Sequence, residues 1–172
     1  VVQERIKYIA LLIICGLICS CQQIPETEIT IHECAPMPNG GRACATCFVV
    51  DSQVYFFAGR DQKGVYQNDL WQYNPKSNHW TNLGTTPLPP RVNATACVQD
   101  NKVYIGLGFN GQYGNDESYL RDWWEYTPAT QEWERLSDYP NHYTDCATSF
   151  AGESELYLCM TSFTAFSSSN SC

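Results

Sequence analysis

The stretch Asp69-Leu-Trp-Gln-Tyr-Asn-Pro75, followed by Trp80, returns further along the chain as Asp122-Trp-Trp-Glu-Tyr-Thr-Pro128, followed by Trp133. Every shared position recurs at an offset of 53, as from 69 to 122 and from 80 to 133. Recurrence at a fixed offset is typical of repeat proteins. The chain therefore contains at least two copies of one structural unit.

A second pattern precedes each of these stretches, at an offset of 49, as from 42 to 91. Its shared positions are Arg42, Ala45-Thr46, Val54-Tyr55 and Gly59 in the first copy, and Arg91, Ala94-Thr95, Val103-Tyr104 and Gly108 in the second. A third copy begins at Ala147-Thr148 and runs through Leu156-Tyr157. The two offsets differ because residues 109–121, rich in Gly, Asn and Tyr, form a longer segment than their counterpart. This composition predicts a loop.

Each unit is predicted to form four short antiparallel strands, the architecture of a propeller blade. The strands expected in the first unit cover residues 44–51, 54–58 and 70–73 and a short stretch around Trp80. Those expected in the second unit cover residues 94–99, 103–107 and 123–126 and a short stretch around Trp133. Asp51-Ser52 and Asp100-Asn101 are turn-forming pairs between the first two strands of each unit.

This order of residues resembles the kelch repeat over about residues 40–158. The repeat markers are Gly59, Trp71, Tyr73 and Trp80 in the first unit and Gly108, Trp124, Tyr126 and Trp133 in the second. The paired glycines of kelch repeats are Ala58-Gly59 and Leu107-Gly108 here, and the third copy has Cys159 and Thr161 at positions matching Gly106 and Gly108. The resemblance implies an all-β fold, an incomplete kelch-type propeller of about two four-stranded blades plus the start of a third.

The number of repeats is too small to close such a propeller, which needs about four to eight blades. An open array exposes apolar faces and unpaired strand edges. Residues 159–172 match nothing in the repeats, so we expect a fragment or a reading frame lost near residue 159. The alternative is a short form that assembles with copies of itself.

The sequence of the first residues predicts that the protein is exported. Arg5 and Lys7 precede the apolar run 8–18, which has the length of a signal peptide rather than a membrane span. Ile18-Cys-Ser-Cys21 resembles the lipobox of bacterial lipoproteins, which implies a signal peptide over 1–20, acylation at Cys21 and a tether over 21–39. The expected partner is then the membrane, reached through a lipid anchor on the bacterial cell envelope. Gln22 in place of Asp favours the outer membrane. An ordinary signal peptide cut near Ser20 and an uncleaved anchor are the alternatives.

The charged residues indicate which classes of ligand to expect. The formal net charge is −8, which argues against a nucleic-acid partner, because phosphate binding requires clustered Lys and Arg. Arg42 and Arg91 take equivalent places, and the kelch resemblance implies that they lie near the mouth of the central channel. There a ring of Arg can hold carboxylates or sugar acids. The alternative is a salt bridge to a neighbouring blade.

Seven cysteines follow Cys21, and their disulfide pairing stays open. Cys44 and Cys47, with His32 and Cys34 upstream, could form a zinc site. However, residues three apart on a strand point to opposite faces. We therefore interpret Cys44 and Cys47 as small buried packing residues and predict no metal site and no cofactor.

The function that these features favour is a protein- or glycan-binding or scaffold module on the cell envelope. The alternative is a fragment of a kelch-fold carbohydrate enzyme, similar to sialic-acid epimerase or galactose oxidase. No catalytic residue can be assigned by matching positions, so an enzyme is the second choice. Fold alone does not supply the substrate.

Overall fold

The computed structural model describes residues 29–112, 116–140 and 146–160. The chain divides into two units, Val1–Glu33 and Cys34–Cys172. In the first unit, residues 29–33 are exposed and have no regular secondary structure. The predicted signal peptide, Cys21 and most of the tail after Cys159 lie outside the described residues.

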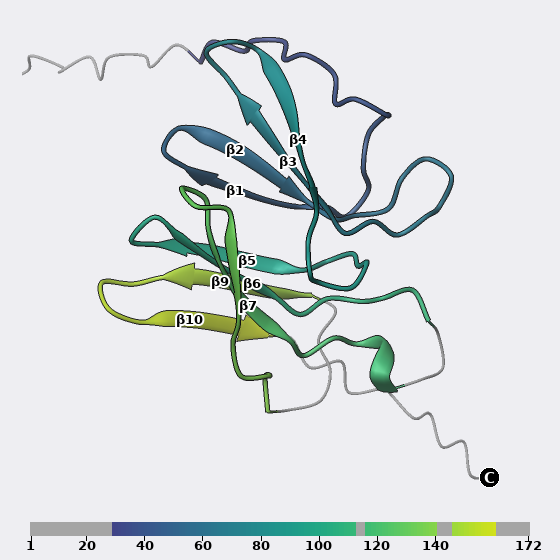
Figure 1. Ribbon diagram of the computed structural model, residues 1–172, viewed down its shortest axis with the longest axis vertical. Coiled ribbons are helices and arrows are strands. Elements are labelled where there is room, and N and C mark those ends of the chain that lie inside the picture. The colour runs from purple at the N-terminus through teal and green to yellow at the C-terminus, as the bar shows by residue number, and fades with distance from the viewer. Residues whose placement is uncertain (1–28, 113–115, 141–145, 161–172) are drawn as a thin grey trace, which may run out of the picture. The chain divides into compact units, whose positions relative to one another are not determined.

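The described part of the second unit forms two four-stranded antiparallel sheets and one two-stranded sheet (Figure 1). The strands of the first sheet are β1 (Thr46–Val50), β2 (Gln53–Phe57), β3 (Asp69–Asn74) and β4 (His79–Thr85). Those of the second are β5 (Thr95–Gln99), β6 (Lys102–Gly106), β7 (Trp123–Thr127) and β8 (Glu132–Arg135), and those of the third are β9 (Ala147–Ala151) and β10 (Leu156–Met160). Strand order follows chain order in both four-stranded sheets. The predicted blades and the opening of a third are confirmed.

The turns between the first two strands of each blade follow from their residues. Asp51 and Ser52 have φ of 49° and 61°, and Asp100 and Asn101 have φ of 52° and 61°. Two successive left-handed residues make the tight hairpin turn whose twist matches that of antiparallel strands. Asp and Asn tolerate this backbone better than most residues.

The first strand of each blade begins later in the sequence than predicted. The sequence favoured a strand from residue 44, whereas β1 begins at Thr46. Cys44 and its repeat partner Asn93 both have φ of 56°. This left-handed conformation cannot continue a strand.

The repeated tryptophans have matching partners across the strands. Trp80 lies opposite Tyr73 across β3 and β4, and Trp133 lies opposite Tyr126 across β7 and β8. The ring centroids are 4.9 Å apart in the first pair and 4.4 Å apart in the second. Cross-strand aromatic pairs of this kind stabilise a sheet, so the sequence signature marks the outer strand pair of each blade.

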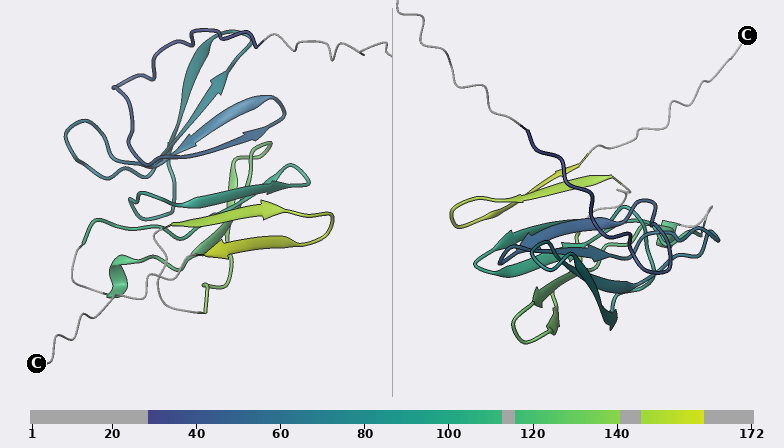
Figure 2. Two further views of the ribbon diagram at one scale, coloured as in Figure 1. Left: turned by 180° about the vertical axis from the view of Figure 1, so that it is seen from behind. Right: turned by 90° about the horizontal axis from the view of Figure 1, so that it is seen from above.

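The sheets pack face to face, with β5 next to both β1 and β9 (Figure 1; Figure 2 shows the same stack from behind and from above). The core between the first two sheets consists mainly of Phe48, Val50, Tyr55, Phe57 and Leu70 on one side and Val103, Ile105 and Tyr126 on the other. Burial of each large apolar side chain contributes about 1.5–3 kcal/mol. Burial also raises the pKa of Tyr126 to about 12.

Candidate ligand-binding site at the loop edge of the blades

One edge of the sheets gathers the loops. Because neighbouring strands run in opposite directions, the start of β1, the end of β2 and the start of β3 meet there: Phe57 pairs with Thr46 and with Leu70. The long β2–β3 and β6–β7 loops leave from this edge, which we call the loop edge. Binding residues in rigid scaffolds concentrate on such loops.

Arg42 is fixed at this edge within the first sheet. Its Nη1 and Nη2 donate to the two carboxylate oxygens of Asp69 at 2.9 and 2.7 Å. Asp69 also accepts a hydrogen bond from Trp71 Nε1 at 2.7 Å. The cluster therefore links the segment before β1 to the first residues of β3.

Arg91 repeats this arrangement in the second sheet and is fully buried. It donates two hydrogen bonds to Asp122, one to Leu107 O and one to Pro89 O, and Trp124 Nε1 donates to Asp122. Burial alone would raise the pKa of Asp122, but the hydrogen bonds and charge of Arg91 outweigh it and lower that pKa.

These contacts bear on the two interpretations of Arg42 and Arg91. Each arginine forms a salt bridge, but its partner belongs to its own sheet and not to a neighbouring blade, as the sequence-based alternative had it. Ligand binding by these residues stays a prediction. The two terminal nitrogens of each guanidinium are already engaged with a carboxylate.

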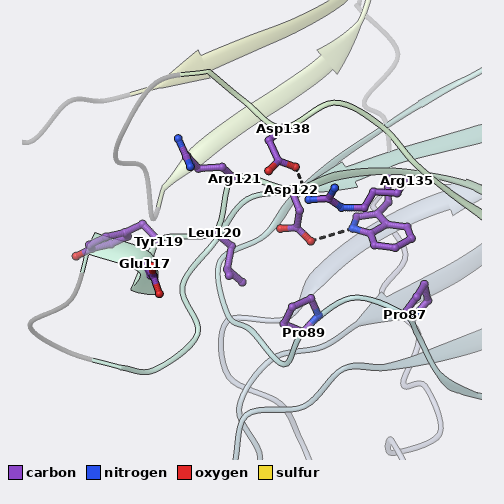
Figure 3. Close-up of a pocket in the computed structure, with 10 residues that line it drawn as sticks. Pro87, Pro89, Glu117, Tyr119, Leu120, Arg121, Asp122, Arg135 and Asp138 are labelled. Carbon is purple, nitrogen blue, oxygen red and sulfur yellow. Dashed lines mark hydrogen bonds and ion pairs between the residues drawn. The ribbon is translucent and has the colours of Figure 1, made fainter.

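A hollow of about 660 Å³ at the loop edge lies against the second sheet (Figure 3). We call it the Trp124 hollow; its lining residues are Pro87, Pro89, Glu117, Tyr119, Leu120, Arg121, Asp122, Trp124, Arg135 and Asp138. Its charges are largely paired within the chain: Arg135 contacts Asp138 at 2.6 Å, and Asp122 is held by Arg91. Arg121 points away from Asp122 in Figure 3. The Trp124 hollow thus offers a surface whose acidic groups already have partners.

A smaller hollow of about 210 Å³ lies where the loops of the first two blades meet. We call it the Arg60 hollow; its lining residues are Cys44, Arg60, Tyr66, Val92, Asn93, Phe109 and Tyr119. Phe109 contacts Tyr66 and Tyr119 with ring centroids 6.4 and 5.3 Å away. The wall therefore combines three aromatic rings with polar groups from Arg60, Cys44 and Asn93.

Arg60 brings the positive charge to this hollow. Its side chain is exposed, and its guanidinium has no hydrogen bond or ion pair to another described residue. Its backbone is fixed, because Arg60 N donates to Ala43 O at 2.9 Å and Ala43 N donates back to Arg60 O. The structure therefore presents an unengaged cation on an anchored backbone.

The loop after Arg60 is held by one carboxylate. Asp61 accepts hydrogen bonds from the backbone N–H groups of Lys63 and Val65 and from the Gln67 side chain, each at 2.9 Å. These bonds, chiefly that from Val65, lower the pKa of Asp61. The loop is therefore preorganised around Asp61, which reduces the ordering cost of ligand binding.

Sequence comparison between repeats had no means of finding Arg60. The position matching it at the offset of 49 is Phe109, so Arg60 breaks the repeat instead of marking it. The useful signal is a departure from the repeat: a charged residue follows the repeat glycine directly in the first blade, and an aromatic residue does so in the second.

The prediction that Cys44 and Cys47 are small buried packing residues is wrong. Cys44 and Cys47 are exposed, whereas Cys97 is buried. Cys44 precedes β1, and Cys47 lies on the face of β1 opposite to the buried side chains of Thr46 and Phe48. Among the described residues, no group of three or more His, Cys, Asp or Glu side chains is placed to hold a metal ion.

Comparison with known proteins agrees with the blade architecture. The family profile of the KLHDC2/KLHL20/DRC7 kelch-repeats domain matches residues 20–158. The chain belongs to the kelch-repeat family. Among solved structures, the kelch fold is shared with the one described as "Structure of YjhT", at a TM-score of 0.62 and 23% identity, over 73% of this chain and 46% of that one.

Curated relatives of this kelch-repeat chain include N-acetylneuraminate epimerases. That of Escherichia coli O9:H4 (strain HS) is 33% identical over 92 residues, which are 51% of this chain and 24% of the relative. That of Pasteurella multocida (strain Pm70) is 32% identical over 88 residues, 48% of this chain and 23% of the relative. The chain thus spans about a quarter of the length of these relatives. In the described ranges, no helix of the kelch-repeat chain is long and apolar enough to cross a membrane.

Proposed function

We propose that this kelch-repeat chain is an envelope-anchored binding module that holds an acidic sugar in the Arg60 hollow. The observation that carries the proposal is the unengaged guanidinium of Arg60 beside an aromatic wall. Guanidinium groups bind carboxylates through two parallel hydrogen bonds. The rings of Tyr66 and Phe109 offer an apolar surface to the C–H face of a sugar.

The partial similarity to N-acetylneuraminate epimerases supports the choice of ligand class. N-acetylneuraminate combines the two groups that the Arg60 hollow can recognise, a carboxylate and a pyranose ring. The Asn93 amide, also at the wall, is a further donor and acceptor for sugar hydroxyls.

The test is a titration of the chain with N-acetylneuraminate in detergent, in which ligand-observed NMR measures the binding. Arg60→Gln is expected to weaken binding at least about tenfold, because a charge-assisted hydrogen bond is lost. Lys63→Gln is the matched control: Lys63 is an exposed cation of the same loop that does not line the hollow, and binding should change less than about twofold. Equal affinities for both variants, or no binding by the unaltered chain, would refute the proposal.

Anchoring is the second part of the proposal and rests on the lipobox resemblance at Cys21. Growth with a radiolabelled fatty acid is expected to label the chain, and Cys21→Ser to abolish the label and release the protein from the membrane fraction. Unchanged labelling of the Cys21→Ser variant would contradict it.

A fragment of a kelch-fold carbohydrate enzyme is the alternative function, favoured by the names of the curated relatives. It predicts faster epimerisation of N-acetylneuraminate in the presence of the chain, whereas a binding module leaves that rate unchanged. Comparing the two rates separates the functions.

A further inference from the structure

Two residues that break the repeat lie at the Arg60 hollow. Arg60 occupies the position that Phe109 takes in the second blade, at the offset of 49. At the same offset, Gly111 occupies the position that Gln62 takes in the first blade. Arg60 lines the hollow, and Gly111 packs against Tyr66 of its wall. Because the first blade has glutamine at the position of Gly111, the blade architecture itself does not require a glycine there.

The two loops carry the same backbone frame around the hollow. In each, the residue after the repeat glycine forms bridges to the segment before the first strand and to a later part of its own loop: Arg60 with Ala43 and Tyr66, and Phe109 with Val92 and Tyr119. The two frames are joined, because Asn93 N donates to Cys44 O at 3.0 Å. The backbone around the hollow is therefore fixed from both blades, so a change at the tip of one loop should move side chains of the wall before it moves the frame.

Gly111 lies directly against the Tyr66 ring. A Cβ at position 111 would lie 2.9 Å from Cε2 and from Cζ of that ring, and 3.2 Å from Cδ2. The Phe109 ring meets the Tyr66 ring at an angle of 68°, with the ring centroids 6.4 Å apart. The β6–β7 loop of the second blade therefore holds a ring of the first blade through two residues. One of these contacts exists only because position 111 has no side chain.

We propose that Gly111 is a positioning residue of the Arg60 hollow, which holds the Tyr66 ring in the wall on which the ring of an acidic sugar packs. The inference rests on the proposed function, in which Arg60 binds the carboxylate. Binding groups have to be held within about 0.5 Å of their productive positions. Carbon atoms do not approach to 2.9 Å, so a side chain at position 111 displaces either the Tyr66 ring or the loop that lies against it. Either displacement changes the wall, while the backbone bridges keep Arg60 in place.

The first measurement follows the Tyr66 ring without a ligand. A chain labelled with 3-fluorotyrosine gives a fluorine NMR signal for each tyrosine, and the signal of Tyr66 is the one missing from the Tyr66→Phe variant. Gly111→Ala is expected to shift this signal. Gly64→Ala is the matched control and should leave the signal in place, because Gly64 has a similar φ of +84° but open space around it.

The second measurement is the affinity of the same variants for N-acetylneuraminate. Gly111→Ala should weaken binding at least about fivefold, because the wall is no longer held in place, and Gly64→Ala less than about twofold. Tyr66→Leu removes the ring without touching Gly111 and should weaken binding to a similar degree. Gly111→Asn separates the ring contact from backbone strain: asparagine tolerates the φ of +88° better than alanine, but it carries the same Cβ. It should therefore weaken binding at least as much as Gly111→Ala.

Four outcomes would overturn the positioning role: a Tyr66 signal that Gly111→Ala leaves unshifted, an affinity that Gly111→Ala or Tyr66→Leu leaves unchanged, recovery of binding in Gly111→Asn, or equal effects of Gly111→Ala and Gly64→Ala. If Arg60→Gln still weakens binding in those cases, the proposed function stands and only the role of Gly111 is refuted. An unaltered chain that does not bind N-acetylneuraminate refutes both. Circular dichroism checks that all variants keep their β-structure.

Discussion

The Arg91 guanidinium donates two parallel hydrogen bonds, at 2.8 and 2.7 Å, to the Asp122 carboxylate at the loop edge of the second sheet. Arg42 and Asp69 form the same pair in the first sheet. Each pair joins the segment before the first strand of its sheet to the start of the third strand. This contact explains why arginine and aspartate recur together in the repeat.

Arg91→Met should destabilise the fold strongly. It leaves the Asp122 carboxylate buried without its cation, and breaking a buried pair in this way costs about 3–5 kcal/mol. Lys102→Met is the control, because Lys102 pairs with Glu125 but is 46% exposed, and such pairs contribute about 0–1 kcal/mol. Urea unfolding measures both values. Similar losses for the two variants would show that the Arg91 pair is not a structural cross-link.

Acid should unfold the chain through the same carboxylates. Burial would raise the pKa values of Asp69 and Asp122, but their arginines outweigh it and lower both. A carboxyl with a lowered folded-state pKa stabilises the fold above its unfolded pKa of about 3.9, and this stabilisation is lost as the pH falls through the folded-state value. The free energy of unfolding should therefore fall steeply below about pH 4. Asp122→Asn should flatten that dependence, and an unchanged slope would rule out this origin.

Thiol reactivity should separate the cysteines by their places in the blade. Burial raises the pKa of Cys97, only partly offset by a hydrogen bond with Ser149, and the side chain is buried. Cys44 is exposed. Because the thiolate is the reactive form, iodoacetamide at pH 8 should modify Cys44 within minutes and Cys97 only after unfolding. Peptide mass spectrometry reads both sites in one sample, and equal rates would contradict the assigned burial.

The blades were predictable because their residues are repeated for local reasons. Trp80 and Trp133 recur because each lies across from a tyrosine, and Asp51-Ser52 recurs as Asp100-Asn101 because the hairpin needs two left-handed residues. Such contacts lie within one blade, so both partners of each contact fall within one repeat and recur together along the sequence.

The candidate site depends on contacts between blades, which repetition does not reveal. The Arg60 guanidinium has no hydrogen bond or ion pair to another described residue, whereas the neighbouring Asp61 bonds to its own loop, and nothing in the sequence distinguishes these two outcomes. Val49 and Val98 take equivalent places in the repeat, yet Val49 is 56% exposed, whereas Val98 is partly buried and packs against the core between the first two sheets.

Gly59, which follows the end of β2 at Phe57, should tolerate no side chain. Gly59 has φ of +88°, and a Cβ there would lie 2.9 Å from Ala45 Cβ and 3.0 Å from Ala43 O. Gly64 has a similar φ of +84° but open space around it, so Gly64→Ala isolates the backbone cost of about 1–2 kcal/mol. Gly59→Ala should lose clearly more, because backbone at Ala43 must also move. Urea unfolding of the two variants gives the difference. Equal losses would mean that the glycine is kept for its backbone conformation alone, and not for the close approach of the segment that leads into β1.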